Sequence, residues 1–168
     1  MAPGNPIHPA LARLARAAEH HDFAELEETL HVAIRKPTWM RPEHRVGDPA
    51  GYMRHLLYID PNDAFVISAI TWLPGQVSSV HAHQVWCLYG VVEGDLTEER
   101  FDQSLVLQEK RVYRPGEIAV RDLDCKMVHR VSNRGIARVV SLHLYGVSAD
   151  KLTTGINRIV EAPDVTRS

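Results

Sequence analysis

Cysteine is scarce in this chain, since Cys87 and Cys125 are the only two among 168 residues. Two cysteines cannot form the disulfide network that stabilises small secreted proteins, and this scarcity favours a reducing compartment, so we expect a cytoplasmic protein. A chain of this length can bury a core large enough for stability without disulfides. We therefore expect a single domain that spans residues 1–168.

Long apolar runs and an excess of positive charge are also missing. No segment approaches the roughly 18–20 consecutive apolar residues that a membrane span needs, and residues 1–21 contain no apolar core of a secretory signal. Lysine and arginine number 19 against 21 acidic residues, which leaves a formal net charge of −2 with both signs scattered along the chain. The composition thus predicts neither a nucleic-acid interface nor a basic membrane-binding patch.

The order of local patterns predicts a mainly β protein with two short N-terminal helices. Apolar residues recur at helical spacing within residues 8–36, and Asp22 followed by Glu25 resembles a capping box before the second helix. From 50 to 147, short runs rich in β-branched and aromatic residues alternate with turn residues, a pattern typical of a sandwich or barrel. Residues 148–168 then form a C-terminal extension.

Histidine, in contrast, is abundant: the chain has ten, and two of them form the motif His81-Ala-His83. On a strand these two side chains point to the same face, so both imidazoles can converge on one point. Neutral imidazole is the commonest metal ligand, but a pair of hydrogen-bonded core histidines has the same spacing. The motif taken alone therefore fits either a metal site or a purely structural pair.

The surroundings of this motif resemble the first motif of the cupin superfamily, which is Gly, then His-x-His, then an acidic ligand, then Gly. Gly75 precedes His81 with five residues between them, and Gly94 closes the segment. Cys87 stands where most cupins have a glutamate ligand. The resemblance implies a double-stranded β-helix, also called a jelly-roll barrel, built around a metal ion.

A second segment, "HRVSN" from His129 to Asn133, resembles the histidine and asparagine of the second cupin motif. The resemblance implies that His81, His83 and His129 hold the metal. Because Cys87 replaces the acidic ligand, three neutral histidines would leave a divalent ion with its full positive charge. Such a centre favours an anionic ligand such as a thiolate, and three protein ligands leave positions for substrate and dioxygen.

Within the cupins, the chain resembles the thiol dioxygenases, which include cysteine dioxygenase and 3-mercaptopropionate dioxygenase. The segment "GYMRHLL" resembles the Tyr-x-Arg segment of that family, and "WLPGQVSSVHAH" resembles the stretch that enters its metal site. The segment "SLHLYG" resembles its Ser-x-His-x-Tyr signature. The likeness implies that iron(II) is the cofactor and that a small thiol carboxylate reacts with O₂ to give its sulfinate.

The resemblance also implies a role for each matched residue. Arg54 would bind the substrate carboxylate, and Tyr52 could hydrogen-bond the same group. Tyr145 would lie beside the iron, with His143 bonded to its hydroxyl and Ser141 orienting His143. The alternate spacing of these three residues places them on one face of a strand.

Cys87 matches the cysteine that is thioether-linked to the signature tyrosine in animal cysteine dioxygenases. The sequence is compatible with either a crosslink between Cys87 and Tyr145 or an unmodified thiol. A purely structural interpretation of Cys87 is also open, because a lone cysteine is often only a small buried apolar residue.

Several alternatives stay open at this point. Cysteine is the first choice of substrate because Arg54 matches the cysteine-type enzymes, and 3-mercaptopropionate and mercaptosuccinate are the alternatives. A zinc centre, a cupin dioxygenase that cleaves carbon–carbon bonds, and a non-catalytic ligand-binding cupin also fit a three-histidine barrel. We expect a small thiol and O₂ as partners, no nucleic acid or membrane, and a monomer or homodimer.

Overall fold

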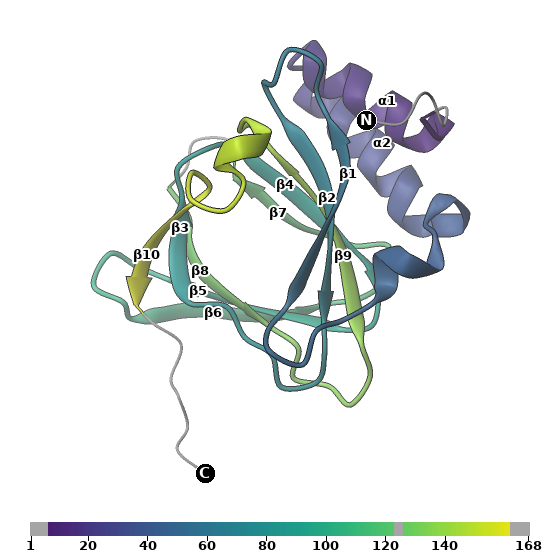
Figure 1. Cartoon of the computed structure of the whole chain (residues 1–168). Coiled ribbons are helices and arrows are strands. Elements are labelled where there is room, and N and C mark those ends of the chain that lie inside the picture. Colours follow the sequence, from purple (N-terminus) through teal and green to yellow (C-terminus); the bar gives the residue numbers. More distant parts are fainter. Residues whose placement is uncertain (1–6, 123–125, 162–168) are drawn as a thin grey trace.

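The computed structural model describes residues 7–122 and 126–161 and shows a β-barrel with two helices packed on its outside (Figure 1). The predicted mainly β barrel with two N-terminal helices is confirmed. Cys125 and residues 162–168 of the predicted C-terminal extension lie outside the described residues. In the described part of the chain, no helix is both long enough and apolar enough to cross a membrane.

The helices begin and end close to their predicted boundaries, as α1 (Pro9–Glu19) and α2 (Phe23–Arg35). The Asp22 side chain accepts a hydrogen bond from the backbone N–H of Glu25 at 3.0 Å, as the capping sequence predicts. Leu14, Leu26 and Leu30 are fully buried where the helices pack on the barrel. Three short 3₁₀ turns follow later in the chain: η1 (Pro37–Trp39), η2 (Pro42–Arg45) and η3 (Ala149–Lys151).

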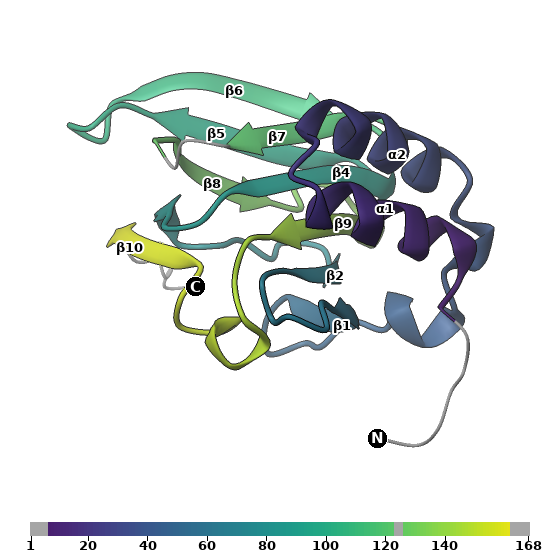
Figure 2. The ribbon, with the colours of Figure 1, turned by 90° about the horizontal axis from the view of Figure 1, so that it is seen from above.

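Two antiparallel sheets of five strands each form the barrel. The first has the order β1 (Met53–Ile59), β2 (Val66–Trp72), β9 (Val139–Tyr145), β4 (Cys87–Glu93) and β7 (Ile118–Asp122). The second has the order β10 (Asn157–Glu161), β3 (Val80–His83), β8 (Val128–Ser132), β5 (Leu96–Phe101) and β6 (Leu107–Tyr113). Figure 2 shows both helices on one side of the barrel and β10 on the other.

Strand β9 is buried on both of its faces, and this explains how it can carry polar residues. Leu142 and Leu144 face outward and join the apolar cluster under the helices. Ser141, His143 and Tyr145 alternate with them and therefore face the barrel interior. The helices thus shield the back of the strand whose front contributes to the site.

Two residues of the cupin-like motifs, Gly94 and Asn133, stabilise turns and do not contribute to the metal site. Gly94 has a φ of 72°, and a Cβ atom there would lie 2.5 Å from the carbonyl oxygen of Arg138. Only glycine fits such a position without strain. The Asn133 side-chain nitrogen donates to the carbonyl oxygens of Trp72 and Ala137, at 2.9 and 2.8 Å. It therefore closes the turn before β9.

Strand β10 was not predicted from the sequence. It lies within the C-terminal extension and pairs antiparallel with β3, the strand that carries the His-x-His motif. Its own residues are mostly exposed, so the segment lacks the alternating apolar pattern that identifies a strand. The pairing with β3 is a tertiary contact, and this contact brings the C-terminal extension to the edge of the site.

Candidate metal centre

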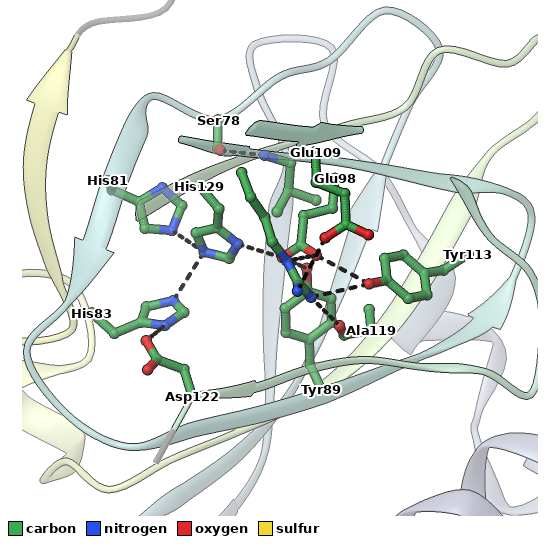
Figure 3. A network of polar contacts seen from close by, with 12 residues as sticks. Ser78, His81, His83, Tyr89, Glu98, Glu109, Tyr113, Ala119, Asp122 and His129 are labelled. Atoms are coloured by element: carbon green, nitrogen blue, oxygen red, sulfur yellow. Dashed lines mark hydrogen bonds and ion pairs between the residues drawn. The ribbon is translucent and has the colours of Figure 1, made fainter. Parts of the chain in front are cut away.

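Three histidines from β3 and β8 converge inside the barrel (Figure 3). His81 and His129 are direct cross-strand partners, and His83 lies two residues along the same face of β3. The Nε2 atom of His129 lies 3.1 Å from that of His81 and 3.4 Å from that of His83. The structure therefore brings together the three residues that the sequence predicts as ligands, although 46 residues separate the two segments.

The Nε2 atom of His129 lies 3.1 and 3.4 Å from those of His81 and His83, spacings that fit a shared metal ion, and the three ligand atoms all lie within 4.8 Å of one another. Nitrogens that bind the same ion at about 2.1 Å lie roughly 3.0–3.4 Å apart for bond angles of roughly 90–110°. The side chains are also buried, with 6%, 5% and 1% of His81, His83 and His129 exposed. Bare imidazole nitrogens at such distances gain little from one another, whereas a cation between them would use all three lone pairs.

Each histidine is oriented through its other ring nitrogen. His81 Nδ1 lies 2.8 Å from the Ser79 carbonyl oxygen. His83 Nδ1 lies 3.2 Å from Asp122 Oδ2, and His129 Nδ1 lies 2.7 Å from Glu98 Oε1. Oxygen acceptors at these positions favour the tautomer with the proton on Nδ1. The Nε2 lone pairs then point to the common centre, as metal binding requires.

The protein environment keeps His81 and His129 neutral. Burial lowers the pKa of His81 to about 3, and neighbouring His129 adds to this effect. Burial also lowers the pKa of His129 well below its usual value, with a further contribution from His83. A metal ion therefore does not have to displace a proton from either ring at neutral pH.

The sequence did not identify Glu98, which is the most connected carboxylate of the site. Only 1% of this residue is exposed, and it accepts hydrogen bonds from Arg100 Nε (2.9 Å) and the hydroxyls of Tyr113 (3.2 Å) and Tyr89 (3.3 Å), besides its contact with His129. Burial raises the pKa of Glu98, and the guanidinium of Arg100 opposes that rise. The sequence offered one signal for Glu98: it is a charged residue at an inward-facing position of strand β5.

Asp122 is the second buried carboxylate that the sequence did not identify. Burial alone would raise its pKa, but the hydrogen bond with His83 lowers it, and the net change is downward. Asp122 ends β7, so it comes from the first sheet, whereas Glu98 comes from the second. Both sheets thus contribute a carboxylate behind a histidine.

We expect Glu98→Gln to weaken binding of a divalent metal ion by roughly 10- to 100-fold, the usual cost of losing an outer-sphere partner of a metal ligand. Glutamine keeps the shape and can still accept from His129, so the variant removes mainly the negative charge. Glu109→Gln is the matched control, because Glu109 is 51% exposed and pairs with the same Arg100. Competition with a chelator measures both affinities, and equal binding by the Glu98 variant and the control contradicts this role.

A pocket opens beside the histidines, and the predicted substrate-binding residues line it. Arg54 on β1 lines it, with its Nη1 atom donating to the carbonyl oxygen of Leu152 at 3.2 Å. The Arg54 guanidinium carbon lies 5.8 Å from the ring centroid of Tyr145. Tyr52, just before β1, packs against Trp72 with ring centroids 4.4 Å apart and the rings tilted by 33°, and it also lines the cavity.

The hydrogen-bonded series Ser141–His143–Tyr145, which the sequence predicted, lies on β9 in the structure. Ser141 Oγ lies 2.7 Å from His143 Nε2, and the Tyr145 hydroxyl lies 2.9 Å from His143 Nδ1. Trp72 Nε1–H donates to Ser141 Oγ at 3.1 Å, and the ring of Tyr89 stacks on His143 with centroids 4.4 Å apart. Trp72 and Tyr89 thus support this series, although their sequence contexts indicated no such function.

Burial sets the protonation of this series. It lowers the pKa of His143 well below its usual value, and the positive charge of Arg54 adds to the effect. It raises the pKa of Tyr145 well above its usual value, with a contribution from the nearby Cys87. At neutral pH, His143 is therefore a neutral ring and Tyr145 keeps its phenolic proton.

Cys87 is a fully buried residue at the start of β4, opposite Tyr145 in the register of β4 with β9. Direct cross-strand neighbours have Cβ atoms about 4.5–5.5 Å apart. The two residues that the family resemblance links by a thioether are therefore adjacent in the barrel interior.

Comparison with known proteins agrees with this geometry. A family model described as cysteine dioxygenase type I matches residues 18–154. The chain belongs to the cysteine dioxygenase type I family. Membership in this family and the three-histidine cluster together support a metal-dependent cupin dioxygenase.

Solved structures show the same fold at low sequence identity. The protein TT1209 from Thermus thermophilus matches with a TM-score of 0.52 at 18% identity, over 62% of this chain and 91% of that one. A protein with a double-stranded β-helix domain from Klebsiella pneumoniae matches with a TM-score of 0.54 at 15% identity, over 71% of this chain and 92% of that one. The predicted cupin fold is thus confirmed.

Proposed function

We propose that this member of the cysteine dioxygenase type I family is an iron(II)-dependent thiol dioxygenase that converts cysteine to cysteine sulfinate. Both atoms of O₂ end on sulfur, which loses the four electrons that O₂ gains. The observation that carries the proposal is a cavity lined by Arg54 and by three converging histidines, with no carboxylate in that histidine group. We place this activity in the cytoplasm, carried by a monomer or homodimer.

The donor set supports a thiolate substrate. His81, His83 and His129 are uncharged ligands, so a bound divalent ion would keep its positive charge and attract an anionic sulfur. When bound, iron(II) supplies the redox chemistry that O₂ needs in order to react with a thiolate. Zinc has no accessible change of oxidation state and could not supply this redox chemistry.

Arg54 is suited to hold the substrate carboxylate. Its planar guanidinium can form two parallel hydrogen bonds with a carboxylate, which a lysine cannot do. The contact with Leu152 fixes the Nη1 edge of the guanidinium and so orients the rest of the group. With the carboxylate held there, the thiol of a three-carbon acid such as cysteine would be directed toward the histidines that line the same pocket.

The hydrogen bonds on β9 indicate how Tyr145 acts. Trp72 can only donate, so Ser141 Oγ accepts from it and must direct its own proton elsewhere. The His143 ring at 2.7 Å is a closer acceptor for that proton than the Ile70 carbonyl oxygen at 3.5 Å. His143 Nε2 then accepts, its Nδ1–H donates to the Tyr145 oxygen, and the phenolic proton of Tyr145 is free to donate into the cavity.

Oxygen consumption by iron-loaded protein tests the proposed function. Cysteine, 3-mercaptopropionate and mercaptosuccinate are supplied in turn, and metal-free protein is the control. We expect cysteine to give the fastest uptake, with one O₂ consumed per cysteine sulfinate formed. If no thiol raises uptake above the control, the thiol dioxygenase assignment is wrong.

A further inference from the structure

Two buried polar atoms on the wall of the metal cavity lack hydrogen-bond partners. In the described part of the chain, five buried side-chain polar atoms have no such partner, and Arg54 Nε and Asn157 Oδ1 are two of them. Both residues line the cavity beside the three histidines. Buried polar atoms are normally paired, because an unpaired one costs free energy. A donor and an acceptor unpaired in the same cavity therefore point to a ligand that carries the complementary groups.

The backbone places Asn157 close to the metal centre. It is the first residue of β10 and lies opposite His83 in the register with β3. Side chains of direct cross-strand partners project to the same face of a sheet, so Asn157 shares the cavity face of His83. The backbone N–H of Gln84 donates to the Ile156 carbonyl oxygen at 2.7 Å and holds this end of β10 in place.

One C-terminal segment contacts Arg54 and contains Asn157. Leu152 accepts from Arg54 Nη1 through its carbonyl oxygen, and Asn157, five residues later, lines the cavity. The cysteine dioxygenase type I match ends at residue 154, so β10 lies beyond it. The family match alone therefore does not assign Asn157 to any function.

We propose that Asn157 Oδ1 accepts a hydrogen bond from the substrate amino group and makes the site selective for an α-amino thiol carboxylate. The inference rests on the proposed thiol dioxygenase function, in which Arg54 holds the carboxylate. An α-amino group and its carboxylate share one carbon atom, so an acid of this class can reach Arg54 and Asn157 together. A mercapto acid without the amino group would leave the Asn157 oxygen buried and unpaired.

The competing arrangement has the Asn157 amide turned over, so that its NH₂ group joins Arg54 on the carboxylate. Asparagine can present either end, and the two arrangements make different predictions for substrates. An acceptor for the amino group affects cysteine alone, since 3-mercaptopropionate differs from cysteine only by lacking that group. A donor to the carboxylate affects both thiols equally.

The experiment compares kcat/KM for cysteine and 3-mercaptopropionate in iron-loaded protein with and without Asn157→Ala. We expect the unchanged protein to prefer cysteine, and the substitution to lower kcat/KM for cysteine by about 10- to 100-fold. Turnover of 3-mercaptopropionate should stay within about threefold, since it makes no use of the Asn157 oxygen. Asn157→Asp, which keeps an acceptor, should retain the preference for cysteine. Arg158→Ala changes the exposed neighbour on β10 and is the matched control, with both values unchanged.

Three results overturn the inference. They are an equal loss for both thiols in Asn157→Ala, no loss for either, and a preference of the unchanged protein for 3-mercaptopropionate. In the first two cases the unchanged protein still prefers cysteine, so the proposed function stands and only the role of Asn157 is wrong. In the third case the thiol dioxygenase assignment stands, but cysteine as the preferred substrate is wrong together with the role of Asn157. Absence of thiol-dependent oxygen uptake in the unchanged protein instead removes the proposed function and, with it, the inference.

Discussion

Iron content is expected to fall from about one ion per chain to near zero when His129 is replaced by alanine. His129 makes the closest contacts with both other histidines, so its loss leaves two ligands on one strand. The loss of affinity should exceed the roughly 10- to 100-fold that an outer-sphere change produces. Thiol-dependent oxygen uptake should drop to the level of metal-free protein. Elemental analysis and an oxygen electrode measure the two effects.

The control for this variant is His55→Ala, which removes a histidine from β1 outside the cluster and should leave iron content unchanged. Because His129→Ala also leaves the buried Glu98 without its ring partner, circular dichroism must first show that the variant folds. A folded His129→Ala protein that still carries one iron per chain would contradict the three-histidine centre.

Replacing Arg54 with alanine is expected to raise KM for cysteine by about 100-fold, with a smaller effect on kcat. Truncating one partner of a hydrogen-bonded charge pair costs about 2–5 kcal/mol, or roughly 30-fold to several thousand-fold in affinity. Arg54 is only half-buried, so the lower part of that range applies. Arg54→Lys should recover only part of the loss, because an ammonium group cannot reproduce the paired hydrogen bonds. Initial rates of oxygen uptake over a range of cysteine concentrations give both constants.

Arg45→Ala provides a matched control, since Arg45 pairs with Glu93 at 2.7 Å and does not line the metal cavity. A dioxygenase that cleaves carbon–carbon bonds would need an apolar pocket and would have no use for a guanidinium. If Arg54→Ala leaves KM for cysteine unchanged, the carboxylate-binding role is wrong and that rival function gains support.

Local patterns in the sequence predicted the general architecture, and the resemblance of its motifs to those of the cupins implied the ligands. The spacing His81-x-His83 places two imidazoles on one face because a strand repeats every two residues. The same rule places Ser141, His143 and Tyr145 on one face of β9, where the structure shows them hydrogen-bonded. Helix capping at Asp22 was likewise a local property of a few neighbouring residues.

Contacts between distant segments could not be predicted in the same way. Glu98 lies behind His129 and Asp122 lies behind His83 because of how β5, β7 and β8 are arranged around the barrel interior. Asn157 reaches the cavity only because β10 pairs with β3. Nothing in the few residues around these positions specifies such partners.

By itself, the sequence determined a mainly β barrel with two capped helices, three histidines available as ligands, and a polar face on β9. The capped helices, the His81-x-His83 pair and the polar face of β9 depend on the periodicity of a single helix or strand, which neighbouring residues set, whereas His129 was assigned through the resemblance of its segment to the second cupin motif. The tertiary structure alone decided which carboxylates orient the ligands and which C-terminal residue completes the cavity. The reason is that strand order and register bring together groups that lie far apart along the chain.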